Sequence, residues 1–164
     1  MNLLPGSSQG IIFGVLFTIL GSVAVVAGLS YFFYCPCERT PGGWLLGENV
    51  VEPVADWSFA NEVPLCQIQV GSWLPHSVNL NCMSTGGKLY LSCSRCDGKT
   101  WSRVAQEIPE ARIRMYDKVY PVIVRRVEDS QTLDEAWIAR AAKLGRPLDT
   151  PRADGWWSFR VVSR

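Results

Sequence analysis

Charge is missing from the first part of the chain, where no Asp, Glu, Lys, Arg or His precedes Glu38. Histidine is nearly absent as well, since His76 is the only one among the 164 residues. No run of Lys and Arg is interleaved with aromatic residues and the formal net charge is only +1, so we expect no nucleic-acid partner. A Gly-rich phosphate loop and a hydrolase set of Ser, His and Asp are also lacking. What remains is an uncharged head followed by a body of ordinary charge.

The uncharged head contains one long apolar segment, residues 10–34. A helix needs roughly 20 apolar residues to cross the hydrocarbon core of a bilayer. An aromatic cluster, Tyr31 to Tyr34, ends the segment where an interfacial belt is expected. A cleaved signal peptide is the alternative, but no Lys or Arg precedes the segment and no Ala-x-Ala site follows it. We therefore expect a short tail at 1–9 and a single-pass membrane helix at 10–34, in contact with lipid.

Small residues recur on one face of this helix. Gly14, Gly21 and Gly28 are spaced by seven, which is close to two helical turns. Such a face lets a second helix approach closely, either in a homodimer or in a complex with other membrane subunits. The alternative is that glycine is simply common in membrane helices. The few charges beside the helix leave open which side of the membrane the remaining chain faces.

A linker follows at residues 35–61. Two Pro and two Gly lie between Cys35 and Gly43, so the helix cannot continue there. The later part of the linker holds aromatic residues among acids, which suggests that it packs on the domain or lies along the membrane. Trp57 to Phe59 has the composition of a short edge strand. A single globular domain is expected at residues 62–164.

The globular body shows six short stretches with strand character. Apolar and polar residues alternate at 65–70, 77–83 and 111–115, and strand-type residues fill 88–93, 119–127 and 156–162. Gly86-Gly87 supplies the positive φ angles of a tight hairpin turn. Two helices are expected, at 101–107 with Thr100 as its cap, and at 133–144, ended by Gly145. The buried stripe of the second helix is expected to be Ala136, Trp137, Ala141 and Leu144.

Short strands joined by tight turns favour a barrel closed on itself over a parallel sheet. The order of elements, with the runs Ile108–Ile113 (Ile-Pro-Glu-Ala-Arg-Ile) and Val119–Val122 (Val-Tyr-Pro-Val), resembles the flavin-reductase-type split β-barrel. This is the fold of pyridoxamine-phosphate-oxidase-like proteins and of deazaflavin-dependent nitroreductase relatives. The tail from Leu133 to Val161 is similar to the last helix and strand of that family. The expected fold is thus mainly β with two short helices, a six-stranded split β-barrel preceded by one transmembrane helix.

The resemblance implies a homodimer that binds FMN or a deazaflavin at the subunit interface. It also implies that the cofactor phosphate is held by basic and hydroxyl side chains around the third strand, the next loop and the short helix. The matching positions are Ser92, Ser94, Arg95, Lys99, Thr100 and Trp101. A helix start beside Lys and Arg suits a phosphate on physical grounds. The alternative is a solvated polar loop in which Thr100 is an ordinary cap.

Six cysteines are many for this length, and three interpretations stay open. Cys93 and Cys96 form a CxxC in the same loop as the implied cofactor site, and could be a structural or redox-active disulfide. With the Cys35-Pro-Cys37 segment they could instead bind zinc, although we expect neither zinc nor haem. Cys66 and Cys82 fall within strands and are expected to be small buried hydrophobic residues. A disulfide favours an oxidising compartment and a flavin favours the cytoplasm, so the two readings predict opposite orientations.

His76 precedes the second strand and is expected to be exposed, with a haem ligand or an acid near a ring cofactor as the alternative. Two functions follow from the sequence. The first is a membrane-anchored, flavin- or deazaflavin-binding oxidoreductase. The second is a non-catalytic accessory subunit of a membrane complex, in which the barrel is a scaffold. The sequence contains no convincing acid/base pair or nucleophile, and fold alone does not assign function.

Overall fold

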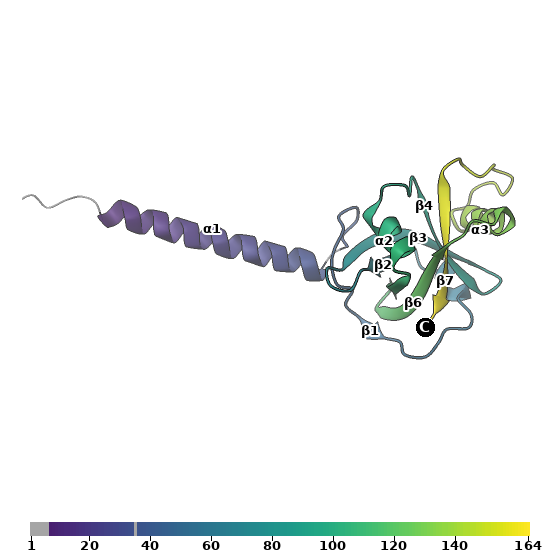
Figure 1. Ribbon diagram of the computed structural model, residues 1–164, viewed down its shortest axis with the longest axis horizontal. Coiled ribbons are helices and arrows are strands. Elements are labelled where there is room, and N and C mark those ends of the chain that lie inside the picture. Colours follow the sequence, from purple (N-terminus) through teal and green to yellow (C-terminus); the bar gives the residue numbers. More distant parts are fainter. Residues whose placement is uncertain (1–6, 35) are drawn as a thin grey trace, which may run out of the picture.

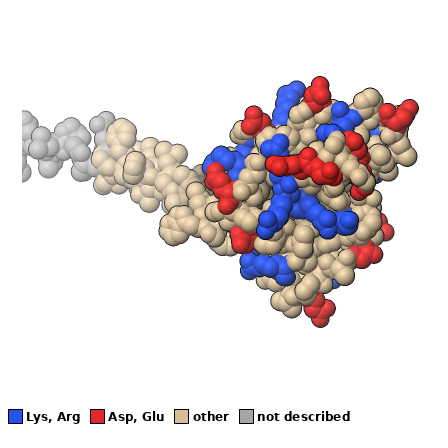
Figure 2. Space-filling view, turned by 45° about the vertical axis from the view of Figure 1, so that its right-hand side comes forward, with Lys and Arg blue, Asp and Glu red and all other residues tan. Residues whose placement is uncertain are grey.

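The computed structural model describes residues 7–34 and 36–164, with the side chains of 7–9 left out. Residues 1–6 of the tail expected at 1–9, and Cys35, lie outside the described residues. Helix α1 (Ser7–Tyr34) projects away from the globular part as one continuous element (Figure 1). Its segment Gly10–Tyr34 is long and apolar enough to cross a membrane, and none of its 18-residue apolar window is buried by the rest of the protein. Figure 2 shows that Lys, Arg, Asp and Glu side chains are confined to the globular part.

The globular part begins with a covering segment and continues into strands and two further helices. In chain order these are β1 (Glu48–Asn49), a 3₁₀ helix η1 (Ser58–Asn61), β2 (Cys66–Val70), β3 (His76–Thr85), β4 (Lys88–Ser94), α2 (Thr100–Glu107), β5 (Glu110–Met115), β6 (Lys118–Arg126), α3 (Ser130–Lys143) and β7 (Trp156–Ser163). Each of the six predicted strands and both predicted helices is present within a few residues of its expected bounds.

The six long strands close into an antiparallel barrel, as predicted. Neighbours run in the order β6-β5-β2-β3-β4-β7, and β7 pairs back with β6. The hairpin between β3 and β4 turns at Gly86 and Gly87, whose φ angles are +55° and +73°. A side chain at either position would be strained, because L-residues rarely adopt this region. The two-residue strand β1 adds to the edge of β6 in parallel.

Buried side chains fill the interior of the barrel. The alternating inward residues of the six strands, such as Ile68, Leu91 and Phe159, form one buried cluster. That cluster continues into Trp101 and Ala105 of α2, and into Trp57, Ala60 and Val63 around η1. These helical segments therefore pack as plugs against the barrel core. A ligand of this domain must bind on the outer surface, because its interior is taken up by protein.

Helix α3 covers part of the outer surface, against β3 and β7. Ala136 and Trp137 pack there with Met83, Tyr90 and Trp156 in a second, smaller cluster. Ala141 is buried as predicted, but Leu144 is 40% exposed. The prediction for Leu144 was wrong because α3 ends at Lys143, so the next residue already leaves the helix surface.

Three local predictions also differ from the structure. Thr100 does not cap α2, because it is the first helical residue and Lys99 stands at the cap position. Residues 57–59 do not form an edge strand, since η1 begins at Ser58 and Trp57 is buried in the core. The short strand β1 went unpredicted because its partner, Lys118, is distant in the sequence.

Two disulfides lie in the barrel wall and its adjoining loop. Cys66 in β2 joins Cys82 in β3, with 5.8 Å between their Cα atoms, and Cys93 joins Cys96 with 5.6 Å. Cys37 is disulfide-bonded as well. The Cys93–Cys96 disulfide is one of the interpretations that the sequence left open for this pair. Cys66 and Cys82 are fully buried as predicted, but they are cystine halves and not free hydrophobic thiols. Within residues 7–34 and 36–164, no cluster of His, Cys, Asp and Glu with metal-binding geometry occurs.

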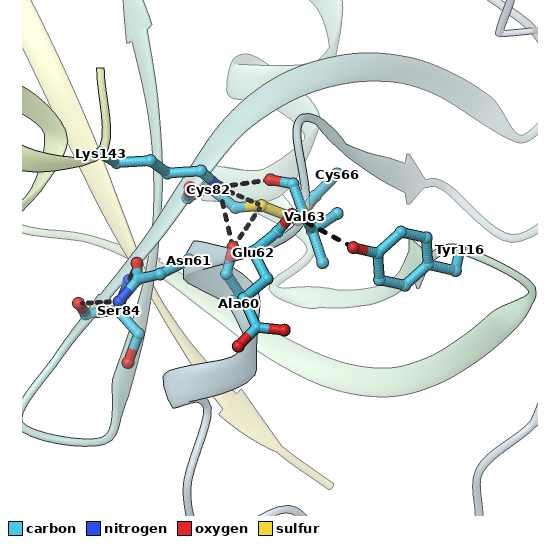
Figure 3. The surroundings of a disulfide bond; sticks show 9 residues. All are labelled: Ala60, Asn61, Glu62, Val63, Cys66, Cys82, Ser84, Tyr116 and Lys143. Atoms are coloured by element: carbon cyan, nitrogen blue, oxygen red, sulfur yellow. Dashed lines mark hydrogen bonds between the residues drawn. A yellow bond between two sulfur atoms is a disulfide. The ribbon is translucent and has the colours of Figure 1, made fainter. Parts of the chain in front are cut away.

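The surroundings of the Cys66–Cys82 disulfide tie α3 to the barrel (Figure 3). The Lys143 ammonium donates hydrogen bonds to the backbone carbonyls of Ala60 at 2.8 Å, Val63 at 2.5 Å and Cys82 at 2.6 Å. One cation thus joins the end of α3, the plug around η1 and strand β3. Burial lowers the pKa of Lys143 from its ordinary value.

Residues 36–50 form a strap across the outer face of the barrel. Polar side chains that point outward from β2 and β3 hold its first part: Gln67 Nε2 donates to the Pro36 carbonyl at 3.3 Å, and Asn79 Nδ2 to the Glu38 carbonyl at 2.8 Å. Gly42 and Ser77 exchange two backbone hydrogen bonds, both of 2.8 Å. The linker is therefore part of the folded domain at this point.

Arginines of β5 hold the second part of the strap. Arg112 donates to the Leu45 carbonyl at 3.1 Å and to Asn49 Oδ1 at 2.9 Å, and Arg114 donates to the Leu46 carbonyl at 2.9 Å. Both guanidinium groups are partly buried, and this burial lowers the pKa of each. Because the strap lies over β2 and β5, part of that outer face of the barrel is covered by the protein's own chain.

Candidate functional site

The loop between β4 and α2 carries the residues that the resemblance implied for phosphate binding. Arg95, with a φ of +55°, and Lys99 are both exposed, and the Lys99 ammonium donates to the carbonyl of Ser94 at 3.1 Å. No side chain caps α2 in this part of the chain. The first turn of α2 thus lacks a side-chain cap and follows two exposed cations in the sequence, and an uncapped helix start near positive charge favours an anion.

The structure brings only some of the six predicted residues together. Lys99 and Trp101 line a common hollow of about 300 Å³. Ser94, Arg95 and Thr100 are exposed beside it. Ser92 is buried in β4 and does not line the hollow, so its hydroxyl lies apart from the basic side chains.

Trp101 belongs to the core as much as to the hollow. Its ring is 2% exposed and lies 4.9 Å from the ring of Phe159, centroid to centroid. Its indole Nε1–H is buried without a hydrogen-bond partner, an unusual state for a tryptophan. Ser102, the next residue, donates its hydroxyl to the carbonyls of Cys96 at 2.5 Å and Lys99 at 2.9 Å. The Cys93–Cys96 disulfide and the hydrogen bonds from α2 thus restrain the loop between β4 and α2.

Sequence reasoning missed the strap residues that form the other wall of the hollow. Glu38, Arg39 and Thr40 line it together with Lys99, and Asn79 of β3 lines it as well. The hollow therefore holds two side-chain cations, one carboxylate and a hydroxyl. The only sequence signal was the pair Glu38-Arg39 after an uncharged head, and it did not indicate that the linker would fold back onto β3.

A larger and more apolar cleft lies between the strap and β5. Its volume is about 520 Å³, within the range of about 300–1,000 Å³ common for small-molecule sites. Trp44, Val50, Ile108 and Pro121 supply most of its apolar wall. Arg112 lines it too, but that guanidinium already serves the strap. The cleft offers apolar contact with few free polar groups.

His76 does not line either space. It is half-buried at the start of β3, where burial lowers its pKa. The expectation of an exposed loop histidine was therefore wrong, because pairing with Val70 of β2 draws His76 into the barrel wall.

Comparison with known proteins identifies the fold. No protein-family model matches the chain, and no curated protein matches it. Solved structures do match. HutZ of Vibrio cholerae, described as a haem storage protein, superposes with a TM-score of 0.54 at 14% identity, over 65% of this chain and 85% of that one. The chain has the split β-barrel fold that its sequence resembles.

Two further structures agree. A Listeria innocua protein named for pyridoxamine 5′-phosphate oxidase has a TM-score of 0.52 at 10% identity, over 65% of this chain and 88% of that one. A Bacteroides thetaiotaomicron protein named for 5-nitroimidazole antibiotic resistance has a TM-score of 0.52 at 12% identity, over 68% and 82%. The names of these neighbours differ, so the likeness establishes the fold and leaves the ligand to other arguments.

Proposed function

We propose that the chain is a single-pass membrane protein whose split barrel binds a flavin-type cofactor, FMN or a deazaflavin, on its outer surface. The observation that carries the proposal is the basic hollow at the start of α2. There Lys99 and Arg39 line one hollow with Trp101, at the start of a helix that no side chain caps. The resemblance implies a flavin phosphate at the same loop, and a helix start beside cations suits a phosphate. The phosphate end of the cofactor would lie against Lys99, Arg95 and Thr100. Its ring would extend over the surface toward a second subunit.

The residues present fit a phosphate in charge and in chemistry. Lysine and arginine form strong charge-assisted hydrogen bonds to phosphate oxygens, and Thr40 and Thr100 add hydroxyl donors. Glu38 offsets one of the positive charges in the hollow. When bound, a flavin would supply hydride or electron transfer, and the protein would contribute binding and orientation.

Disulfides favour one side of the membrane for the barrel. The two cystines and the disulfide-bonded Cys37 favour an oxidising compartment, because disulfides are rare where cellular reductants keep thiols reduced. We place the globular domain on the extracytoplasmic side and the N-terminus of α1 on the cytoplasmic side. This orientation agrees with the disulfides. The barrel would then bind its cofactor either in the cytoplasm before export or on the extracytoplasmic side after it.

The test measures the absorbance spectrum of the full chain purified in detergent. Spectra are taken before and after incubation with FMN, or with a deazaflavin in its oxidised or its reduced form. We expect a flavin-type spectrum that follows the protein. Lys99→Ala should weaken binding by roughly 10- to 100-fold, because a charge-assisted hydrogen bond contributes about 1.5–3 kcal/mol and about 1.4 kcal/mol is tenfold in affinity. Arg103→Ala is the matched control, since Arg103 lies on the same helix but pairs with Glu107 at 3.2 Å.

The same spectra separate flavin from haem. The likeness to a haem storage protein makes haem a competing cofactor, and the earlier expectation against it has no support in the structure. A Soret band in place of a flavin spectrum would overturn the flavin proposal. A colourless protein that binds neither cofactor would overturn both.

A second candidate is a non-catalytic accessory subunit. It is favoured by the scatter of the six predicted residues and by the bare glycine face of α1. A Cβ added at Gly14, Gly21 or Gly28 would meet nothing within 4 Å, so a second helix has open access to that face. A homodimer through α1, or a complex with other membrane subunits, would use this surface. Gly21→Leu should then reduce association of the full chain in detergent, measured by cross-linking, while cofactor spectra stay unchanged.

A further inference from the structure

The loop between β2 and β3 exposes large apolar side chains to solvent. Residues 71–75 read Gly-Ser-Trp-Leu-Pro and carry no charge. Trp73 is 94% exposed and Leu74 is 72% exposed, the first of these being the most exposed large hydrophobic residue described. Gly71, with a φ of +76°, begins the turn that presents them. Two adjacent apolar side chains without packing partners call for an explanation, whereas isolated ones do not.

The loop lies beside the end of α1. Ser77, just after the loop, exchanges two backbone hydrogen bonds with Gly42 of the strap. Two residues on, the Trp44 N–H donates to the Phe32 carbonyl in the last turn of α1 at 3.2 Å. Trp44 also links the two regions directly, since it lines one hollow with Phe33 and the large cleft with Ser72. The start of β3 and the barrel end of α1 are neighbours in Figure 1.

Exposed aromatic side chains thus occur at the end of α1 and in two stretches connected to it, the strap and the loop between β2 and β3. Tyr34 is 80% exposed at the last position of α1, Trp44 is 37% exposed in the strap, and Trp73 is the tip of the loop. Tryptophan and tyrosine concentrate at membrane–water interfaces, where the ring is buried and its polar group stays hydrated. Apolar side chains at this level lie about 5–10 Å into the boundary of headgroups and acyl chains.

We infer that Trp73 and Leu74 insert into the lipid interface and form a second membrane contact of the barrel, beside the exit of α1. The inference rests on the proposed membrane helix and adds an occupant for the loop, the lipid bilayer itself. Lipid is favoured over a second protein copy because the strap connects the loop, through hydrogen bonds, to the aromatic end of α1. The absence of charge in the loop also removes the main obstacle to insertion.

The test uses Trp73→Cys in the full chain, labelled with an environment-sensitive fluorophore without reductant so that the native disulfides stay closed. The labelled protein is reconstituted into phosphatidylcholine vesicles, with or without doxyl-labelled lipid. We expect a blue-shifted emission that doxyl lipid quenches. Leu148→Cys is the matched control, because Leu148 is 55% exposed in the loop between α3 and β7, which lies far from α1 in Figure 1. Its label should remain water-like and unquenched.

A third label separates this inference from the proposal on which it rests. Leu20→Cys places the fluorophore in the middle of α1. Quenching at 20 without quenching at 73 would leave the membrane helix standing and overturn the docking of the loop. Loss of quenching at both positions would overturn both. Shielding at 73 that grows with protein concentration but ignores doxyl lipid would also overturn the inference, since the loop would then bind a second copy.

Discussion

The Cys66–Cys82 disulfide should contribute more stability than the Cys93–Cys96 disulfide, and the difference follows from the length of chain that each one closes. Cross-linking stabilises mainly by reducing the entropy of the unfolded chain, and the effect grows with the logarithm of loop length. The first disulfide spans a separation of 16 residues, which corresponds to about 3 kcal/mol. The second spans 3 residues, which corresponds to about 1.6 kcal/mol.

The assay is denaturant unfolding of the full chain in detergent, followed by tryptophan fluorescence. Two double variants are compared with the parent, Cys66→Ala with Cys82→Ala, and Cys93→Ala with Cys96→Ala. All four sulfur atoms belong to buried residues, so the cavity left by each pair is similar and largely cancels in the comparison. We expect the first variant to lose about 1.5 kcal/mol more than the second. Equal losses, or a larger loss for the second variant, would refute the loop-entropy reasoning.

Three further predictions concern single residues. Lys143→Met should cost about 2–4 kcal/mol in the free energy of unfolding, because three backbone carbonyls lose a charged donor while the apolar stem is kept; the same denaturation assay measures it. The pKa of His76 is lower in the folded protein than in the unfolded chain, so the unfolded chain binds a proton at His76 more readily. The free energy of unfolding should therefore fall as the pH drops below 7 through 6.5. His76→Gln should remove that part of the pH dependence. Gly87→Ala should cost about 1–2 kcal/mol because its φ is +73°, whereas Gly87→Asn should cost less; a thermal melt of the two variants checks the order.

The barrel itself was predictable because its signal is local. Alternation of apolar and polar residues defined β2 and β5, and the Gly86-Gly87 pair defined the β3–β4 hairpin. Inward residues had to be apolar in every strand, so the pattern survives in the sequence. The long apolar helix α1 was equally visible, since its uncharged length is a property of one continuous stretch.

The rest was hidden because it depends on contacts between distant residues. The disulfide partner of Cys66 follows from register, which sets Cys66 opposite Leu80 and brings Cys82 next to it diagonally. The outward Gln67 and Arg112 looked like ordinary solvent-facing residues, although they hold a strap that is far away in sequence. For the same reason Arg39 was missed at the candidate site, because its place there depends on how the linker folds back.

The strap limits how far the barrel can move relative to α1. A free linker of 27 residues would let a tethered domain explore a radius of roughly 30 Å. Here the Phe32 carbonyl already binds the Trp44 amide, and hydrogen bonds continue along the barrel to Val50. The linker therefore leaves the domain little freedom to move relative to α1, and the two rotate and diffuse as a single body. With α1 in a membrane, as proposed above, any partner of the domain would have to reach the same membrane surface, where the search is two-dimensional and the angle of approach is fixed in advance.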